Sequence, residues 1–495
     1  MEQYKKINEK DNVVVALTNL KKGEAIIAGN KETTLKSDVK CGHKIAIEAI
    51  NENEDIIKYG FPIGHCTINI HPGEIVHTDN TKTNLNGILK YTFQQKLNKN
   101  PYEDRQLTFK GYLREDGNVG IRNDLFIVPT VGCVNGIADK MIERFMESAG
   151  EPAVGSVQVV KHNYGCSQLG DDHLNTRNIL RNITKHPNTG GALVLGLGCE
   201  NNKVIDFKAA LGEYNENRIK FLEIQEVPDE IEEGVKLLKE LYETMKKDKR
   251  EAVSLSKLKV GLKCGGSDGL SGITANPLLG EFSDFLIAQG GTTILTEVPE
   301  MFGAETMLMD RAKDEEVFQK IVHLVNDFKE YFMKYDQPIY ENPSPGNKAG
   351  GITTLEDKSL GCTQKAGSET VADVLKYGEV IKNHGLNLLS APGNDLVATT
   401  ALGAAGCQLV LFTTGRGTPF GSFVPTLKVS TNSAIYKLKP HWIDFNAGTL
   451  VEGKKMETLL EEFISYIIRV AEGEFVNNEK NNFKEIAIFK SGVTL

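Results

Sequence analysis

The sequence has little of what marks secreted, membrane-bound or nucleic-acid-binding proteins. Its 495 residues include only eight cysteines and one tryptophan, and no apolar run is long enough to cross a bilayer. Acidic residues outnumber basic ones by 66 to 57, which gives a formal net charge of −9. A nucleic-acid-binding protein would carry a basic surface, and a small secreted protein would carry many disulfides. We therefore expect a cytoplasmic protein with free thiols, and neither a nucleic-acid nor a membrane partner.

Several common cofactor motifs are also missing. The chain has no Walker loop, no strand followed by GxGxxG and no HExxH. The usual nucleotide-binding and hydride-transfer functions therefore lack support. A hydrophobic content of 40% and a charged content of 25% are those of an ordinary globular protein, and the length predicts roughly two to four domains.

The spacing of apolar residues divides the chain into three regions and a linker. Residues 1–90 contain short apolar runs separated by Gly, Asn and Lys, which predicts a small β domain. Residues 91–107 are polar and aperiodic, as a linker would be. Strands alternate with helices over 108–337 and again over 338–495, so we expect two α/β domains with mostly parallel sheets. Helices are expected over 229–249, 278–289, 314–334 and 457–470.

The stretch LKVGLKCGGSDGLSGITANP, from Leu258 to Pro277, has the order of a strand, a Gly-rich turn and a helix. Glycines let backbone N–H groups approach a ligand, and a helix N-terminus favours anions. The loop could therefore hold a carboxylate or a phosphate, with Cys264 and Asp268 beside it. Such turns are about as often used for tight packing alone.

Four cysteines each follow an apolar run typical of a strand: Cys133, Cys166, Cys199 and Cys264. The first three are separated by equal intervals of 33 residues, a natural length for one βα unit. If the strands form one parallel sheet, all four thiols lie at its carboxyl edge, where α/β proteins bind ligands. Thiolates there suit iron or zinc. We interpret the other four cysteines as small buried hydrophobic residues: Cys41, Cys66, Cys362 and Cys407.

Long motifs in a fixed order now point to a known family. The first region contains DNVVVAL, GHKIA, IIKYGFPIG and VHTDNTKTNL, and the rest contains GYLREDGNVGIRN, GLGCE, CGGSDGLSGITANP, EVPEMFGAE, EDKSLG, TTGRGTP and STN. Through these motifs the chain resembles the altronate and galactarate dehydratases over nearly its whole length. The resemblance implies a ferrous-iron-dependent hydro-lyase that converts a sugar acid into a 2-keto-3-deoxy acid. The overall similarity is greatest to the family members that act on D-altronate, for which the product would be 2-dehydro-3-deoxy-D-gluconate. It also implies that the first region is a β-clip module of the SAF type. Some members act on galactarate or eliminate sulfite from sulfolactate.

Dehydration of a 2,3-dihydroxy acid requires a base for the C2 proton and an acid for the leaving C3 hydroxyl. We expect His43 and His77 to supply these groups, because imidazole titrates near neutral pH and both follow turn signals. Lys58 and Tyr59 of IKYG are the second candidates. A further set is expected to bind the substrate hydroxyls and carboxylate: Arg122, Asp268 and Arg416.

The metal ligands stay open at this point. A subset of the four strand-end cysteines, with His162 of KHNYGC, is one candidate set. Three thiolates with one open position suit an iron–sulfur cluster that acts as a Lewis acid, whereas a mononuclear site would recruit histidine and carboxylate. Alternatively, His43 and His77 hold the iron and the cysteines line the pocket.

Two other classes of function also stay open. An electron-transferring iron–sulfur centre would make the protein an oxidoreductase, and a sugar-acid sensor would bind without turnover. We also expect a homo-oligomer, since acidic enzymes of this size often consist of identical subunits.

Overall fold

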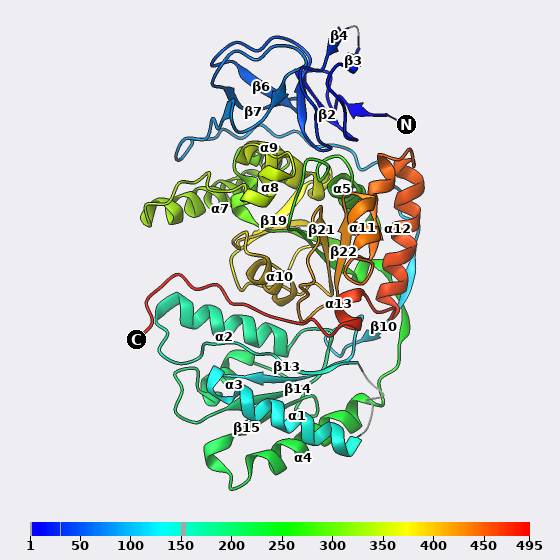
Figure 1. Cartoon of the computed structure of the whole chain (residues 1–495). Helices are drawn as coiled ribbons and strands as arrows, with labels where there is room; N and C mark the ends of the chain where they lie inside the picture. Colours follow the sequence, from blue (N-terminus) through cyan, green and yellow to red (C-terminus); the bar gives the residue numbers. More distant parts are fainter. Residues whose placement is uncertain (1, 30, 150–154) are drawn as a thin grey trace.

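The computed structural model describes residues 2–29, 31–149 and 155–495. The chain forms three domains, and Figure 1 shows the first and second domains on opposite sides of the third. Among the described residues, no helix combines the length and the apolar character that a bilayer crossing requires.

The first domain is the small β module expected from the sequence. One antiparallel sheet has the order β1-β2-β5-β8, a second has the order β6-β7-β9, and β3 pairs with β4. A two-residue turn, Tyr59-Gly60, joins β6 to β7, and its φ angles of 59° and 79° are those of a type I′ hairpin. The strands are β1 Tyr4–Lys5, β2 Val13–Ala16, β3 Ala25–Ala28, β4 Lys31–Thr34, β5 Lys44–Ala46, β6 Asp55–Lys58, β7 Phe61–Cys66, β8 Ile75–Val76 and β9 Thr81–Lys82.

The second domain contains a four-stranded parallel sheet of order β13-β12-β14-β15. Alternate residues of β12 face opposite sides, as the two-residue period of a strand requires. Leu125 and Ile127 pack with α1 and α4, whereas Phe126 and Val128 pack with α2 and with the third domain. The elements are β12 Asp124–Pro129, α1 Asn135–Ala149, β13 Val157–Val159, α2 Gly170–Thr184, β14 Thr189–Gly196, α3 Val204–Leu211, β15 Ile219–Glu223 and α4 Glu230–Met245. A separate sheet, β10 Thr108–Leu113, β11 Val119–Gly120 and β16 Glu251–Ser254, lies where the two domains meet.

The third domain is built on a seven-stranded parallel sheet of order β19-β20-β18-β17-β21-β22-β23. Its strands are β17 Lys259–Cys264, β18 Thr292–Leu295, β19 Val371–Leu375, β20 Gly385–Leu389, β21 Leu409–Thr414, β22 Thr426–Ser430 and β23 Phe445–Asn446. Its helices are α5 Ala275–Ala288, α6 Glu305–Met309, α7 Glu315–Lys334, α8 Pro345–Ala349, α9 Leu355–Thr363, α10 Asp395–Ala404, α11 Ser433–Leu438, α12 Met456–Ala471 and α13 Asn477–Lys480.

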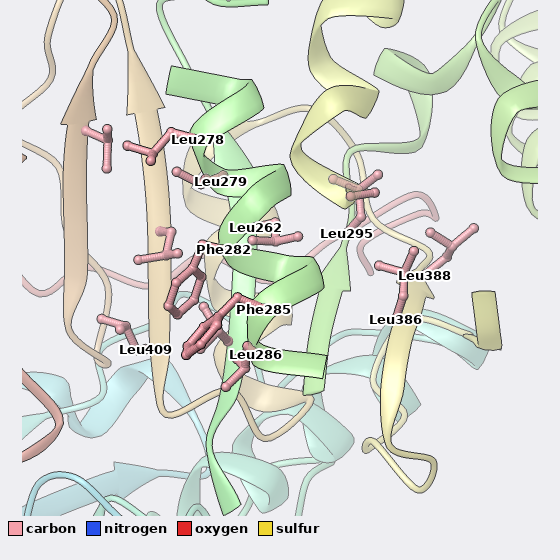
Figure 2. Packing of buried hydrophobic residues seen from close by; sticks show 14 of the residues in the cluster. Leu262, Leu278, Leu279, Phe282, Phe285, Leu286, Leu295, Leu386, Leu388 and Leu409 are labelled. Carbon is pink, nitrogen blue, oxygen red and sulfur yellow. The ribbon is translucent and has the colours of Figure 1, made fainter. Parts of the chain in front are cut away.

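Helix α5 supplies much of the core of the third domain. Its apolar residues recur at helical spacing and pack against leucines of β17, β18, β20 and β21 (Figure 2). Phe282 is 1% exposed in this contact. Truncation of such a side chain to alanine typically costs about 3–5 kcal/mol. This packing fixes the direction of the Gly-rich loop that connects β17 to α5.

The α/β class with a small first β domain is confirmed, and α4, α5, α7 and α12 lie where helices were expected. The expected domain boundary after residue 337 is wrong, because β17 and β18 pair with β21 and β20 in one sheet. Residues 338–350 instead connect α7 to α9 within the third domain. Residues 91–107, all of them described, contain no helix or strand, and Tyr91, Phe93 and Tyr102 pack on the third domain.

Candidate active site

The first domain covers the carboxyl edge of the seven-stranded sheet. The Gly-rich loop that follows β17 meets the first domain there, and a Cβ atom on Gly269 would clash with the backbone carbonyl of Gly42. Only glycine permits so close an approach of two backbones. The Gly269 N–H also donates to the carbonyl of Gly350, which precedes α9. Loops from both domains therefore meet at one place.

Two histidines of the first domain face each other at this place. Strand β5 pairs with β8 so that Lys44 lies opposite Val76, and each histidine is the next residue outward. The ring centroids of His43 and His77 are accordingly 5.1 Å apart. Burial lowers the pKa of His43, and burial with the charge of Lys44 lowers the pKa of His77 to about 4. Both rings are therefore neutral at pH 7, and His77 Nδ1 is buried with no hydrogen-bond partner in the described chain.

A buried ion triad joins the first domain to α9. The carboxylate of Asp357 accepts hydrogen bonds from Lys44 Nζ at 2.8 Å and Lys58 Nζ at 2.9 Å, and all three side chains are buried. Burial opposes the charged form of Asp357, but the two ammonium groups outweigh it and hold its pKa well below the usual range. Burial lowers the pKa of Lys44 to about 8, with Asp357 offsetting part of the shift. For Lys58 the charge of Asp357 outweighs burial and raises the pKa.

The tip of the β6–β7 hairpin reaches into the third domain. Tyr59 is 8% exposed, and its hydroxyl lies so close to Gly272 that a Cβ atom there would clash with it. Lys58 Nζ lies 4.6 Å from the centre of the Tyr59 ring. A narrow cavity contacts Tyr59, Ser267 and Asp268, and it extends to Asp357 and α9.

Two residues of the Gly-rich loop have different surroundings. Asp268 accepts hydrogen bonds from Ser271, Thr431 and Asn432, and burial raises its pKa against their effect. The Ser267 hydroxyl is buried without a partner among the described residues, although it lines the cavity. Sequence reasoning missed Ser267, since a serine in a Gly-rich loop carries no signal of its own.

Behind the cavity lies a buried cluster of thiols, carboxylates and ammonium groups. Cys264 Sγ is 3.4 Å from Cys362 Sγ and 3.1 Å from Glu300 Oε2. The lysine contacts are Lys365 Nζ to Cys264 Sγ at 2.6 Å, Lys358 Nζ to Glu300 Oε1 at 2.8 Å, and Lys263 to Glu297. Cys362 is buried as expected, but it was not expected beside Cys264, because α9 and β17 are far apart in the sequence.

This cluster contains the ligand types of a metal site. The ligand atoms of Cys264, Glu300 and Cys362 all lie within 4.8 Å of one another. Lys365 already contacts the Cys264 thiol, and Lys358 already binds the Glu300 carboxylate. These ammonium groups neutralise the carboxylate charge of the cluster and would repel a cation. The arrangement fits a buried ion network better than a metal site.

The other strand-end cysteines lie elsewhere, so the expectation that four thiols share one sheet edge is wrong. Cys133, Cys166 and Cys199 are exposed and follow β12, β13 and β14 of the second domain. Cys264 is separated from them because β17 belongs to the other sheet. His162 is buried, and its ring contacts the Pro129 carbonyl and the Tyr164 N–H at 2.8 and 3.1 Å. Both ring nitrogens therefore support the fold rather than offering a ligand.

The two arginines expected to bind substrate differ. Arg122 is 2% exposed. Its guanidinium donates hydrogen bonds to the Glu479 carboxylate and to the carbonyls of Ile121, Val470 and Glu474. It joins the second and third domains, so the substrate-binding expectation is wrong for Arg122. Arg416 is exposed beside the Gly-rich loop and makes a hydrogen bond of 3.3 Å to the Gly346 carbonyl.

Family models match the three domains in order. They are described as the altronate/galactarate dehydratase SAF domain (residues 2–84), the D-galactarate dehydratase/altronate hydrolase second domain (111–246) and the D-galactarate/altronate dehydratase C-terminal domain (255–494). The chain belongs to the altronate/galactarate dehydratase family. It is therefore a hydro-lyase, and its first domain is a SAF domain.

The relatives that are similar over the whole length carry two names. Altronate dehydratase of Bacillus subtilis strain 168 is 64% identical and that of Escherichia coli K12 is 57% identical, each over 100% of both chains. Galactarate dehydratase (L-threo-forming) of E. coli K12 is 32% identical over 95% of this chain and 93% of its own. None of these three is named as an oxidoreductase.

Proposed function

We propose that the protein dehydrates D-altronate to 2-dehydro-3-deoxy-D-gluconate. The choice of substrate rests on the two full-length altronate dehydratases, which are far more similar to this chain than the galactarate enzyme is. The observation that carries the mechanism is the meeting of His43, His77 and Lys44 above the Gly-rich loop of the third domain.

The acid–base step uses groups of the SAF domain. A neutral imidazole of the histidine pair takes the C2 proton, and the electron pair of that C–H bond forms the C2–C3 double bond as the C3–O bond breaks. The leaving hydroxyl takes a proton to become water, and the enol product tautomerises to the 2-keto acid. Lys44 suits the proton donor, because a pKa of about 8 leaves it protonated at pH 7 and able to release a proton.

Charge develops on the substrate carboxylate when the C2 proton leaves. The ammonium group of Lys58, which Asp357 holds, favours that charge, and the exposed guanidinium of Arg416 can bind a carboxylate with two hydrogen bonds. Tyr59 lines the cavity from the SAF side.

The test is an anaerobic assay of the purified protein with ferrous iron and a thiol. D-altronate, galactarate and sulfolactate are supplied separately, and the 2-keto-3-deoxy acid and sulfite are measured. We expect 2-keto-3-deoxy acid from D-altronate without any electron acceptor. Product from galactarate alone, or sulfite from sulfolactate alone, would contradict the proposed substrate.

A further inference from the structure

We infer that Cys264 and Cys362 form a reversible redox site, which hydrogen peroxide converts from two thiols into one disulfide. The inference goes beyond the proposed function, because it concerns two thiols to which the dehydration gives no role. It does not depend on which sugar acid the cavity takes.

The two sulfur atoms lie close together in the folded chain. Cys264 Sγ is 3.4 Å from Cys362 Sγ, and the two residues are only 1% and 3% exposed. Glu300 Oε2 lies 3.1 Å from the first sulfur and 3.2 Å from the second, so one carboxylate oxygen holds both thiols side by side. A disulfide bond is about 2.0 Å long, so a shift of about 1.4 Å, shared between the two side chains, brings the sulfurs to bonding distance.

Both cysteines lie at the ends of their elements, where such a shift is possible. Cys264 is the last residue of β17, and the Gly-rich loop follows it directly. Cys362 lies in the last turn of α9, next to the final residue of that helix. Because neither sulfur is carried by the middle of a strand or helix, the approach of the two side chains need not break the hydrogen-bond pattern of either element.

The surroundings of this pair are those of reactive thiols. Lys365 Nζ lies 2.6 Å from Cys264 Sγ. Burial disfavours the ammonium form of Lys365, but the neighbouring Cys264 and Glu297 outweigh burial and keep the lysine pKa well above its usual value. Negative charge that develops on a sulfur when a thiol loses its proton therefore faces an ammonium group, which stabilises it. Cys407, in contrast, is buried in an apolar cluster, as a purely structural thiol would be.

The cavity at the domain contact gives a small oxidant a route to the pair. Cys362 lines this narrow cavity together with Tyr59 and Ser267, and Cys264 lies behind Cys362. A molecule as small as hydrogen peroxide therefore meets the Cys362 sulfur first, and the Cys264 sulfur is the second reactant. A larger oxidant such as oxidised glutathione does not fit so narrow a space.

The reaction balances with hydrogen peroxide as the two-electron oxidant. The Cys362 sulfur gives up its proton and attacks one peroxide oxygen, the O–O bond breaks, and the other oxygen leaves as water, so that Cys362 becomes a sulfenic acid. The Cys264 sulfur then gives up its proton and attacks the Cys362 sulfur. The S–S bond forms as the S–O bond breaks, and the second oxygen leaves as water. A dithiol reductant reverses the oxidation by thiol–disulfide exchange.

The test maps the thiols rather than turnover. The folded full-length protein is reduced, desalted and treated with hydrogen peroxide. It is then quenched in acid, alkylated at the remaining thiols, digested and analysed by mass spectrometry. We expect a linked pair of peptides that contain Cys264 and Cys362, lighter by two hydrogen atoms than the separate peptides and absent after treatment with dithiothreitol. Oxidised glutathione should give no linked pair, and an equal yield with it would overturn the route through the cavity.

Serine variants identify the two sulfurs. Cys264→Ser and Cys362→Ser should each lose the linked pair of peptides, because one of its sulfurs is missing. Cys407→Ser, at a buried thiol of the same domain, is the matched control and should keep the linked pair. Wild-type protein that is unfolded in urea before the peroxide is added should lose the preference for this pair, because the folded geometry directs the reaction.

Two results would overturn the inference. One is a wild type in which Cys264 and Cys362 both stay free for alkylation after the exposed cysteines have been oxidised. The other is oxidation of either residue singly, to a sulfinic acid, with no linked pair of peptides. Both results come from the wild type and need no turnover, so they stand even if a serine variant fails to fold, and this inference and the proposed function can fail separately.

Discussion

Replacement of Asp357 by asparagine perturbs the contact between the SAF domain and the third domain most directly. Asp357→Asn keeps the size of the side chain but removes the charge that binds Lys44 and Lys58 at 2.8 and 2.9 Å. Two ammonium groups then stay buried without a counter-ion. Breaking a buried ion pair from one side costs about 3–5 kcal/mol, and we expect the free energy of unfolding to fall by that amount at pH 7.

The pH dependence of this loss tests its cause. Without the carboxylate, burial should hold the pKa values of both lysines in the folded variant below their unfolded value of about 10.4. Between the folded and unfolded pKa values the unfolded chain binds more protons, so stability rises with pH in that window. The deficit of Asp357→Asn relative to wild type should therefore narrow between pH 7 and about pH 9.5, as measured by urea unfolding.

An exposed ion pair supplies the control. Lys21 and Asp38 lie 2.8 Å apart on the surface of the SAF domain, with side chains 73% and 61% exposed. Asp38→Asn should leave the urea midpoint unchanged, because solvent screens this pair. An Asp357→Asn protein that unfolds at the wild-type urea concentration at pH 7 would refute the reasoning, and so would a deficit that grows with pH.

Three further outcomes are expected from the same interface. His43→Ala and His77→Ala should each lower kcat roughly 10²–10⁴-fold, and near-normal turnover in both would remove acid–base work from the SAF domain. The pKa of His77 is lowered to about 4 in the folded protein, so its contribution to stability is present above pH 6.5 and is lost as the pH falls toward 4. As the pH falls from 6.5 to 4, the urea midpoint should fall less in His77→Asn than in the wild type. An identical dependence of the midpoint on pH in the two proteins would argue against the lowered pKa of His77. Gly269→Ala should lower the free energy of unfolding, because the new Cβ atom would clash with Gly42. In the control Gly136→Ala the Cβ atom meets open space in α1, so the free energy of unfolding should stay the same or rise by up to about 1 kcal/mol. Equal urea midpoints for the two variants would contradict this expectation.

The candidate site could be predicted in part, because some of its residues carry local signals. His43 and His77 follow turns of a small β domain, and antiparallel pairing of β5 with β8 then brings them face to face. Tyr59 lies in the turn of the hairpin formed by IIKYGFPIG, a stretch that the pattern of apolar residues assigned to the small β domain. Asp357 carried no such signal, since a carboxylate in the first turn of a helix is ordinary. It matters only because two lysines about 300 residues away in sequence, at separations of 299 and 313, lie against it.

The sequence by itself determined the local elements and the family. The period of the apolar residues specifies which segments become strands and which become helices. The long motifs, in their order along the chain, specify the family. Each of these signals is a property of consecutive residues. Only the tertiary structure decided how the strands are divided between sheets. Strand β17 pairs with β21 rather than with β14, so Cys264 lies beside Cys362, 98 residues further along the chain, and apart from the three exposed thiols. Strand pairing across such separations depends on the packing of both faces of each sheet, which no short stretch of sequence contains.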